Sequence, residues 1–536
     1  PFVWIERRIP PDRAQQVRAS NLEGVGVADE IRRYYPCKES GAHLIGFVGA
    51  DNQGLEGLEK RFDPYLRGPQ CSLVQLRDAM GRPFSISRPI YSDQGMHDLV
   101  LTIDKDIQFK AQQALRSAVN KSRAKGGNCL VVDSETGQIL AMAVVPEFNP
   151  NVFSKYKSSQ WRNRAVTDCF EPGSTIKAFL LAACLEERVL TTRTMLDCEQ
   201  GEYKVGAHVI HDTKKNGVLS VLDIITHSSN IGGIKMGQRL GYAIFHDYLQ
   251  KFGFGNRIGN DFLGERKGYI RPTEKARTID QATLFFGQGM SSTSLQIAMA
   301  MAAIANGGKL MRPYVVKAII DESGRTVEEA QPQVIKQAIS QSTARKVARV
   351  LECAVSDEGT GAQASIAGFR VAGKTGTSQK VDPHTKRYSR TKYVATFAGF
   401  VPVDNPKFVI SVTIDEPKGI HYGGLVAGPV FSEVGQWVLN YFRLNPQLRQ
   451  AEKLKDVKNH AKRKSSSVPN RTTLKVEDGT LPDFRGLGMR DVLKKGRSLG
   501  LKVLLVGTGL AVKQEPTPGT PLNRVSTVKV KFRPPA

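Results

Sequence analysis

Three short motifs in this chain combine residue types that could transfer an acyl group through a serine. The first runs from Ser174 to Lys177, directly after the helix-breaking pair Pro172-Gly173 and before an apolar helical pattern. A serine at a helix start lies at the positive end of the helix dipole, and a lysine three residues later lies on the same helical face. A lysine with a lowered pKa could then accept the serine proton. A helix-capping serine beside an exposed lysine would give the same pattern.

The Ser-x-x-Lys spacing alone is not specific. It also occurs elsewhere in the chain, for example at Ser122, Ser154 and Ser526. Only Ser174 follows a Pro-Gly break and precedes a run of apolar residues with helical periodicity. This context selects Ser174 as the candidate nucleophile.

The second motif is SSN at 228–230, which lies between two segments with helical patterns. The Ser228 hydroxyl could relay a proton, and the Asn230 amide could orient a substrate that contains an amide group. The same residue types commonly cap helices, so the motif alone leaves both interpretations open.

The third motif, KTGT at 374–377, is compatible with two different folds. Residues 368–375 satisfy the phosphate-binding pattern G-x-x-x-x-G-K-[ST], which requires a strand before it and a helix after it. The residues that follow contain a glycine and a proline and have no helical periodicity, so we reject a nucleotide-binding loop. We instead predict a strand on which Lys374 supplies positive charge for a carboxylate, Thr375 a hydroxyl and Gly376 close backbone approach.

The elements around these motifs predict an α+β fold. Residues 129–145 contain two apolar runs joined at Glu-Thr-Gly, which predicts a β-hairpin. Helical patterns dominate 175–306, and strand patterns return between 369 and 415. Strands at both ends of one unit, with helices between them, predict an antiparallel sheet with an inserted helical region.

The chain divides into four predicted parts. Residues 453–464 are dense in Lys and Arg and run into a serine-rich stretch, which is typical of a solvated linker. After this linker we predict one short helix and two strands, at 501–507 and 528–532. The predicted boundaries are 1–97 for an N-terminal domain, 98–450 for a catalytic domain, 451–476 for the basic linker and 477–536 for a small C-terminal domain.

The composition excludes several classes of protein. With 40% apolar and 24% charged residues, the 536-residue chain is expected to fold into about three domains. The net charge of +25 suggests an anionic neighbour, but no basic stripe alternates with aromatic residues, so nucleic acid is not expected. The seven cysteines contain no CxxC pair, which argues against a structural zinc site. No run of 18 apolar residues occurs, and we expect a membrane anchor to precede Pro1.

The residues around the motifs resemble the class B penicillin-binding proteins, which are monofunctional peptidoglycan D,D-transpeptidases. The similarity covers NRAVTDCFEPGSTIKAF, THSSNIGGIKMGQRLG, FGQGMSSTSLQIAMAMAAIANGG, VAGKTGT and the N-terminal GFVGADNQGLEGLEKRFD. The middle motif is Ser-Ser-Asn and not the Ser-Asp-Asn of class A β-lactamases, which favours a transpeptidase. The C-terminal LPDFRGLGMRDVLKKGRSLGLKV looks like one PASTA domain. The resemblance implies an N-terminal pedestal (dimerisation-like) domain, a transpeptidase domain with an antiparallel sheet flanked by helices, and a small α/β PASTA domain.

This resemblance also implies a role for each residue of the motifs. Ser174 would attack the D-Ala-D-Ala carbonyl of a stem peptide and form an acyl-enzyme, with Lys177 as the base. Ser228 would pass a proton to the leaving amine, Asn230 would bind the substrate amide, and Lys374 would adjust the proton relay electrostatically.

Substrate binding would fall to the third motif. Thr375, Gly376 and Thr377 would bind the substrate, and the two threonines would hold its terminal carboxylate or the β-lactam counterpart. Backbone N–H groups of Ser174 and Thr377 would stabilise the oxyanion, an effect of about 3 kcal/mol per donor. An amine from a second stem peptide would then resolve the ester. No metal or organic cofactor is expected.

The resemblance further implies partners and a location. We expect peptidoglycan stem peptides and β-lactams as ligands, and a membrane glycosyltransferase and division proteins as partners. The implied location is the bacterial inner or plasma membrane, with the catalytic domain on the periplasmic or extracytoplasmic side, and the implied role is septal cell-wall synthesis. Two alternatives stay open: a serine β-lactamase or D,D-carboxypeptidase, in which water resolves the acyl-enzyme, and a non-catalytic β-lactam sensor.

Overall fold

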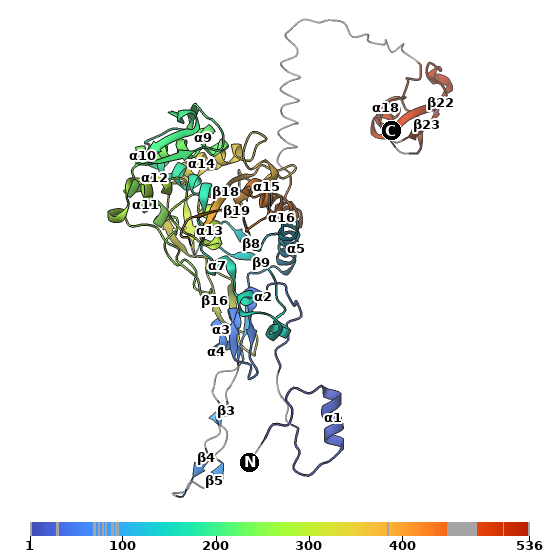
Figure 1. Cartoon of the computed structure of the whole chain (residues 1–536). Helices are drawn as coiled ribbons and strands as arrows, with labels where there is room; N and C mark the ends of the chain where they lie inside the picture. The colour runs from blue at the N-terminus through green and yellow to red at the C-terminus, as the bar shows by residue number, and fades with distance from the viewer. Residues whose placement is uncertain are drawn as a thin grey trace. The chain divides into compact units, whose positions relative to one another are not determined.

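The structure is a computed structural model with two compact units, Pro1–Lys453 and Leu454–Ala536, which we describe separately (Figure 1). It describes residues 3–27, 32–67, 71–72, 75–77, 80, 83–86, 90–91, 96–382, 385–446, 480–507 and 509–533. The predicted linker at 451–476 lies outside the described residues. Among the described residues, no helix has the length and apolar character needed to cross a bilayer.

A five-stranded antiparallel sheet forms the centre of the larger unit. Its strands, in spatial order, are β18 (Ala372–Val381), β19 (Tyr388–Val401), β20 (Phe408–Asp415), β8 (Gly126–Asp133) and β9 (Ile139–Val145). Of these five strands, β8 and β9 come first along the chain, and they form the predicted hairpin. The sheet therefore joins strands from both ends of the catalytic domain, which confirms the predicted α+β fold.

Helices cover both faces of this sheet. Helices α5 (Lys105–Lys121) and α16 (Gly428–Tyr441) lie side by side on one face (Figure 1). The opposite face packs against α13 (Ser294–Ala305). Successive residues of β20 pack on opposite faces of the sheet. Val409 belongs to the hydrophobic cluster with α13, whereas Ile410 belongs to the cluster with α5 and α16.

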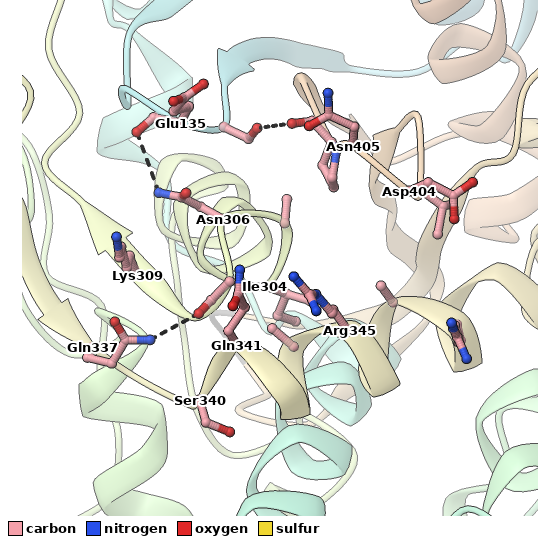
Figure 2. A pocket seen from close by; sticks show the side chains of 18 residues that line it. Glu135, Ile304, Asn306, Lys309, Gln337, Ser340, Gln341, Arg345, Asp404 and Asn405 are labelled. Carbon is pink, nitrogen blue, oxygen red and sulfur yellow. Dashed lines mark hydrogen bonds between the residues drawn. The ribbon is translucent and has the colours of Figure 1, made fainter. Parts of the chain in front are cut away.

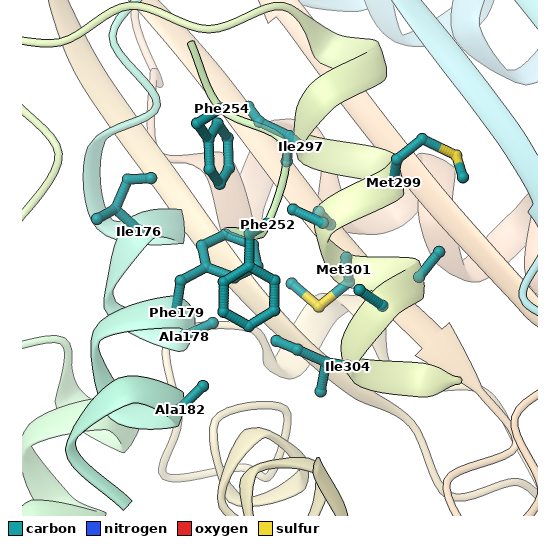
Figure 3. Packing of buried hydrophobic residues seen from close by; sticks show 14 of the residues in the cluster. Ile176, Ala178, Phe179, Ala182, Phe252, Phe254, Ile297, Met299, Met301 and Ile304 are labelled. Carbon is teal, nitrogen blue, oxygen red and sulfur yellow. The ribbon is translucent and has the colours of Figure 1, made fainter. Parts of the chain in front are cut away.

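The helix that follows the first motif, α8 (Lys177–Glu186), is buried all round. It packs near α13, and both helices are mostly apolar and buried on every side, as expected for helices enclosed by protein. Figure 3 shows Phe179 of α8 together with Phe252 and Phe254 between the two helices. The ring of Phe179 lies 5.0 and 5.2 Å from those two rings. This packing fixes the start of α8, and with it the first motif.

The rest of the inserted region contains helices joined by turns and two small strand pairs. The helices are α9 (Val221–His227), α10 (Asn230–Leu240), α11 (Tyr242–Lys251) and α12 (Thr278–Leu284), and α14 (Gln341–Cys353) follows later in the chain. Between α8 and α9 the prediction of helix was wrong. Two small strand pairs occupy this stretch, β10 (Met195–Asp197) with β13 (Val218–Ser220) and β11 (Glu202–Val205) with β12 (His208–His211).

Smaller sheets complete the larger unit. One contains β16 (Thr326–Glu329), β15 (Val316–Ile320) and β7 (Asp98–Leu101), and another pairs β14 (Lys309–Met311) with β17 (Val334–Gln337). The N-terminal domain contributes α1 (Pro11–Ala19), α2 (Ala42–Ile45), β1 (Phe47–Val48), β2 (Gly54–Glu56), α3 (Gly57–Arg61), α4 (Asp63–Leu66) and the short strands β3 to β6 (Cys71–Ser72, Gln75–Arg77, Pro83–Ile86, Ile90–Tyr91). Phe47 stacks on Phe153 at 4.1 Å and contacts Trp161 edge-on, which ties this domain to the catalytic domain.

The smaller unit is a three-stranded sheet with one helix. Helix α18 (Met489–Ser498) precedes β21 (Lys502–Val506), β22 (Leu510–Glu515) and β23 (Thr527–Arg533), and β23 lies between the other two strands. The helix and two of the strands match the prediction, whereas β22 was not predicted. Its core is small and contains Phe484, Val492, Val528, Val530 and Phe532.

Candidate active site

Ser174 lies in a tight turn at the start of α8. Residues Gly173–Ile176 form one turn of 3₁₀-helix, and the α-helix itself begins at Lys177. The prediction that Ser174 lies at the start of a helix is therefore confirmed, although Ser174 lies in the 3₁₀ turn that precedes the α-helix. Gly173 adopts a φ of +57°, and its N–H donates to the carbonyl of Gly287 at 3.1 Å.

Two other backbone segments pack directly against this turn. A Cβ on Gly376 would lie 2.6 Å from the carbonyl oxygen of Pro172, and a Cβ on Gly287 would lie 2.1 Å from that of Gly173. A Cβ on Gly173 would lie 3.4 Å from the backbone nitrogen of Thr377. Only glycine permits such close approach, so the third motif is held against the turn that carries Ser174.

Lys177 connects the first motif to the second. Its side chain is completely buried. The Nζ atom donates to the carbonyl oxygen of Ser228 at 2.7 Å and to Oδ1 of Asn230 at 2.8 Å, and it lies 3.4 Å from Oγ of Ser228. Burial, reinforced by the positive charge of Lys374, holds the pKa of Lys177 well below its usual range.

Lys374 lies on β18 and is also completely buried. Burial lowers the pKa of Lys374 to about 7, and its Nζ lies 3.4 Å from Oγ1 of Thr375. Strand β18 continues to Val381 with no helix after the Lys-Thr pair. The rejection of a phosphate-binding loop at 368–375 is therefore correct, and the predicted strand is present.

The second motif lies in the turn between α9 and α10. Ser228 ends α9 with a φ of +62°, which is an uncommon conformation for a residue with a side chain and directs its carbonyl to Lys177. Ser229 caps α10, because its Oγ accepts from the N–H of Gly232 at 2.9 Å. Asn230 is the first residue of α10.

Sequence reasoning missed Asp212, which holds this turn in place. Its Oδ2 accepts a hydrogen bond from Oγ of Ser229 at 2.5 Å, and its Oδ1 accepts from the N–H groups of Asn230 at 2.5 Å and Ile231 at 3.1 Å. The negative charge of Asp212 also opposes the fall of the pKa of Lys177. Asp212 follows β12 in a segment without a motif, so no local pattern could have singled it out.

The threonines of the third motif have partners from other elements. Oγ1 of Thr375 lies 2.9 Å from Oγ1 of Thr360, and Oγ1 of Thr377 accepts from the N–H of Gly423 at 3.0 Å. Gly423 begins the short helix α15 (Gly423–Val426). Neither Thr360 nor Gly423 was a predicted site residue.

Glu171, three residues before Ser174, was also missed. Its Oε1 accepts from the N–H of Gly289 and from the hydroxyl of Tyr388, both at 2.9 Å. Burial raises the pKa of the Glu171 carboxyl. Tyr388 begins β19, so this contact ties the outer end of the sheet to the segment before the nucleophile.

The other serines with the Ser-x-x-Lys spacing lack this environment. Ser122 ends α5 and donates to the carbonyl of Ala118 at 2.7 Å, and Lys125 is exposed beside Glu416. Ser154 and Ser526 are exposed, as are the lysines three residues after them, and Lys392, three residues after Ser389, is exposed as well. Burial of the lysine is what separates Ser174 from these four serines.

The arrangement suits acyl transfer. A lysine of lowered pKa is available as a neutral amine, which has two N–H groups and one lone pair. The Nζ atom of Lys177 has acceptors in the Ser228 carbonyl and in Asn230, and it lies 3.4 Å from the Ser228 hydroxyl, so a neutral amine at this position can exchange a proton with a hydroxyl. A buried lysine close to serine hydroxyls is the arrangement expected of a serine acyltransferase.

Comparison with known families agrees with this class. Residues 127–436 match the family model of the penicillin binding protein transpeptidase domain, residues 2–97 that of the penicillin-binding protein dimerisation domain, and residues 479–533 that of the PASTA domain. The chain belongs to the penicillin-binding protein transpeptidase family and is a serine-type peptidoglycan D,D-transpeptidase.

Individual relatives cover most of the chain. Stage V sporulation protein D of Bacillus subtilis is 34% identical over 98% of this chain and 79% of its own length. The probable peptidoglycan D,D-transpeptidase PenA of Neisseria gonorrhoeae is 37% identical over 83% of this chain and 74% of its own. The crystal structure of penicillin binding protein 3 from Mycobacterium tuberculosis, complexed with ampicillin, is similar with a TM-score of 0.70 at 32% identity, and covers 77% of this chain and 90% of that one.

Proposed function

We propose that the enzyme cross-links peptidoglycan stem peptides through an acyl-enzyme on Ser174, and that β-lactams acylate the same serine. The observation that carries this proposal is the environment of Lys177. Its amine is fully buried, has a lowered pKa, and has acceptors for both N–H groups in Ser228 and Asn230. Such an amine is a competent base for a neighbouring hydroxyl at neutral pH.

The proposed first step is acylation. The O–H bond of Ser174 breaks, its proton passes to the amine of Lys177, and Oγ forms a bond to the carbonyl carbon of the penultimate D-Ala. The backbone N–H groups of Ser174 and Thr377 stabilise the oxyanion, a role supported by the close packing of their segments. The amide bond to the terminal D-Ala then breaks, Ser228 passes its proton to the leaving amine, and Lys177 returns the proton taken from Ser174 to Ser228.

The proposed second step releases the cross-linked product. The amine nitrogen of a second stem peptide forms a bond to the ester carbonyl carbon, and the bond between that carbon and Oγ of Ser174 breaks. The amine loses one proton, which the basic groups of the site transfer to Oγ to restore the hydroxyl of Ser174. In both steps Asn230 binds the amide of the substrate. In the first step Thr375 and Thr377 bind its C-terminal carboxylate, assisted by the charge of Lys374, and Gly376 allows close backbone approach.

The proposed setting is the septal cell wall, on the extracytoplasmic side of the bacterial plasma membrane. An N-terminal anchor and a membrane glycosyltransferase as partner belong to this proposal, as do division proteins. The name of the B. subtilis relative, a stage V sporulation protein, supports sporulation as a related setting. A fluorescent fusion in growing and sporulating cells distinguishes a division septum from a developing spore.

Covalent labelling by a fluorescent penicillin tests the chemistry. Ser174→Ala is expected to abolish labelling, whereas Ser122→Ala, Ser154→Ala and Ser526→Ala keep it. Labelling that is lost in one of these three variants instead would reject Ser174 as the nucleophile. Turnover of a chromogenic cephalosporin at many per second would replace the transpeptidase by the hydrolase alternative.

A further inference from the structure

A cavity of about 920 Å³ lies away from the three motifs. It is bounded by the end of α13, the first half of α14, the turn between β8 and β9, and the turn at 403–406 between β19 and β20. Figure 2 shows Arg345, Lys309, Glu135 and Asp404 around the opening. The cavity is of the size that binds small organic ligands.

The floor of this cavity is apolar and its rim is basic. Ile304, Ala344 and Ala348 are buried residues of the floor. The basic side chains are Lys309, Arg345 and Arg349, and all three are exposed. Within the described part of the chain, none of these three makes an ion pair or a side-chain hydrogen bond.

The two acidic residues of the cavity already have cationic partners. Asp404 accepts hydrogen bonds from Arg370 at 2.7 and 2.8 Å, and Arg370 also pairs with Glu352. Glu135 lies 3.5 Å from Lys407. Because Lys309, Arg345 and Arg349 outnumber the one carboxylate that these pairs leave uncompensated, the cavity keeps an excess of positive charge, and a concave surface concentrates the field of such charges.

We propose that this cavity binds a carboxylate-bearing stem peptide of peptidoglycan, at a site separate from the catalytic serine. The proposal rests on the proposed function, because that function brings the enzyme to this polymer. Arg345 and Arg349 stand one helical turn apart, about 6 Å, and each guanidinium can bind one carboxylate in a bidentate manner. The apolar floor accepts the methyl groups of alanine residues.

A peptide fits better than a polyphosphate. The first turn of α14 is already capped, because Oγ of Ser340 accepts from the N–H of Thr343 and Ser340 itself donates to Glu186. This helix start therefore offers no additional phosphate site. The apolar floor formed by Ile304, Ala344 and Ala348 also gives a chain of phosphates nothing to bind, whereas it accepts the alanine methyl groups of a peptide.

Binding to the penicillin-acylated full chain tests this proposal, because acylation blocks the catalytic serine. The probe is a dye-labelled disaccharide peptide with free carboxylates, measured by fluorescence anisotropy. Saturable binding is expected, with at least a fivefold weaker affinity in Arg345→Glu. The control is Lys346→Glu, which makes the same change of charge at the adjacent residue of α14. Lys346 is exposed and does not line the cavity, so this variant is expected to bind the probe with unchanged affinity.

Four results would overturn the proposal: no binding to the acylated chain, equal weakening in both variants, equal affinity for a probe whose carboxylates are amidated, or tighter binding of a glycerol-phosphate oligomer. The rate of labelling by fluorescent penicillin is measured on the same samples. If Arg345→Glu is labelled at the normal rate but loses the probe, the effect belongs to the cavity. If the unmodified chain is not labelled at all, the proposed function fails instead.

Discussion

Strand β18 of the catalytic domain and strand β23 of the C-terminal unit place lysines in opposite environments. On β18, residues 372–376 are buried on both faces and Lys374 has no exposure. On β23, buried and exposed residues alternate, and Lys529 and Lys531 are exposed between buried Val528, Val530 and Phe532. A Ser-x-x-Lys spacing, Ser526 to Lys529, begins one residue before β23. A lysine becomes a base only where the fold removes it from water, so burial and not spacing distinguishes the reactive region from the solvated one.

The largest effect is expected when the lysine of a Ser-x-x-Lys pair is replaced, once at Lys177 and once at Lys529. Lys177→Ala is expected to slow acylation by penicillin by about 10²–10⁴-fold, because it removes the base. Lys529→Ala, the matched change on β23, is expected to leave the rate unchanged. The measurement is the time course of fluorescent penicillin labelling. An unchanged rate in Lys177→Ala would show that another group activates Ser174, and a loss of folded protein that matches the lost activity would assign Lys177 a structural role.

The second test uses pH and stability. With the pKa of Lys374 at about 7, the folded chain releases this proton near neutrality, whereas the unfolded chain keeps it until its ordinary pKa of 10.5. The unfolded state binds more protons between these values, so the larger unit is expected to gain stability as pH rises from 7 to 10, by about 1.4 kcal/mol per pH unit. Lys177 acts in the same direction. Below pH 7 this contribution to the slope vanishes.

Lys374→Met is expected to remove most of the contribution of Lys374 to the slope of the unfolding free energy against pH. The measurement is urea unfolding followed by tryptophan fluorescence at pH 7, 8 and 9. Trp4, Trp161 and Trp437 all lie in the larger unit, so the signal reports that unit alone. Lys529→Met serves as the control and is expected to keep the slope of the unmodified chain. Equal slopes in all three proteins would mean that Lys374 is charged in the folded state.

The third test concerns Asp212, which holds the second motif in place through hydrogen bonds and is not itself the proposed base. Asp212→Asn weakens the contacts to Ser229, Asn230 and Ile231 that hold the second motif. A hydrogen bond to a charged group contributes about 1.5–3 kcal/mol, so acylation is expected to slow by about 10- to 100-fold.

A second helix start provides the control for Asp212. Asp223 is bonded to Ser220 at the start of α9, through its own N–H and a carboxylate oxygen. Asp223→Asn is expected to lower thermal stability and to leave the acylation rate per folded molecule unchanged. Equal kinetic effects in the two variants would reduce Asp212 to an ordinary helix cap.

Sequence patterns predicted what is local. The hairpin at 129–145, the turn before α8 and the strand at 374–377 depend on periodicity and on turn residues within a few positions, and all three are present. The strands β10 to β13 have three or four residues each and carry no clear alternation, so helical patterns on both sides masked them. In β22, Lys513 and Gln514 interrupt the apolar residues in the same way.

The contacts that complete the site could not be predicted, because they join residues far apart in the chain. Asp212 reaches Ser229 across 17 positions, and Tyr388 reaches Glu171 across 217. Thr360 has no motif of its own, and only the fold brings it to Thr375. A single sequence names the reacting residues when they form short motifs, but it does not name the residues that orient them.

The smallest effect is expected from removing the C-terminal unit. A chain shortened to residues 1–446 keeps the three motifs and the supporting residues Asp212, Thr360 and Gly423, as well as Leu444, which packs on the cluster beneath α16. The removed unit has a separate core around Phe484 and Phe532. Acylation by penicillin is therefore expected to stay within about twofold of the full-length rate, as for energetically independent sites. Tryptophan fluorescence during heating checks that the shortened chain is folded. A large drop in rate with an unchanged unfolding temperature would show that the C-terminal unit contributes to the active site. The contrast between the buried lysines of one unit and the exposed lysines of the other would then no longer distinguish the catalytic part of the molecule from the rest.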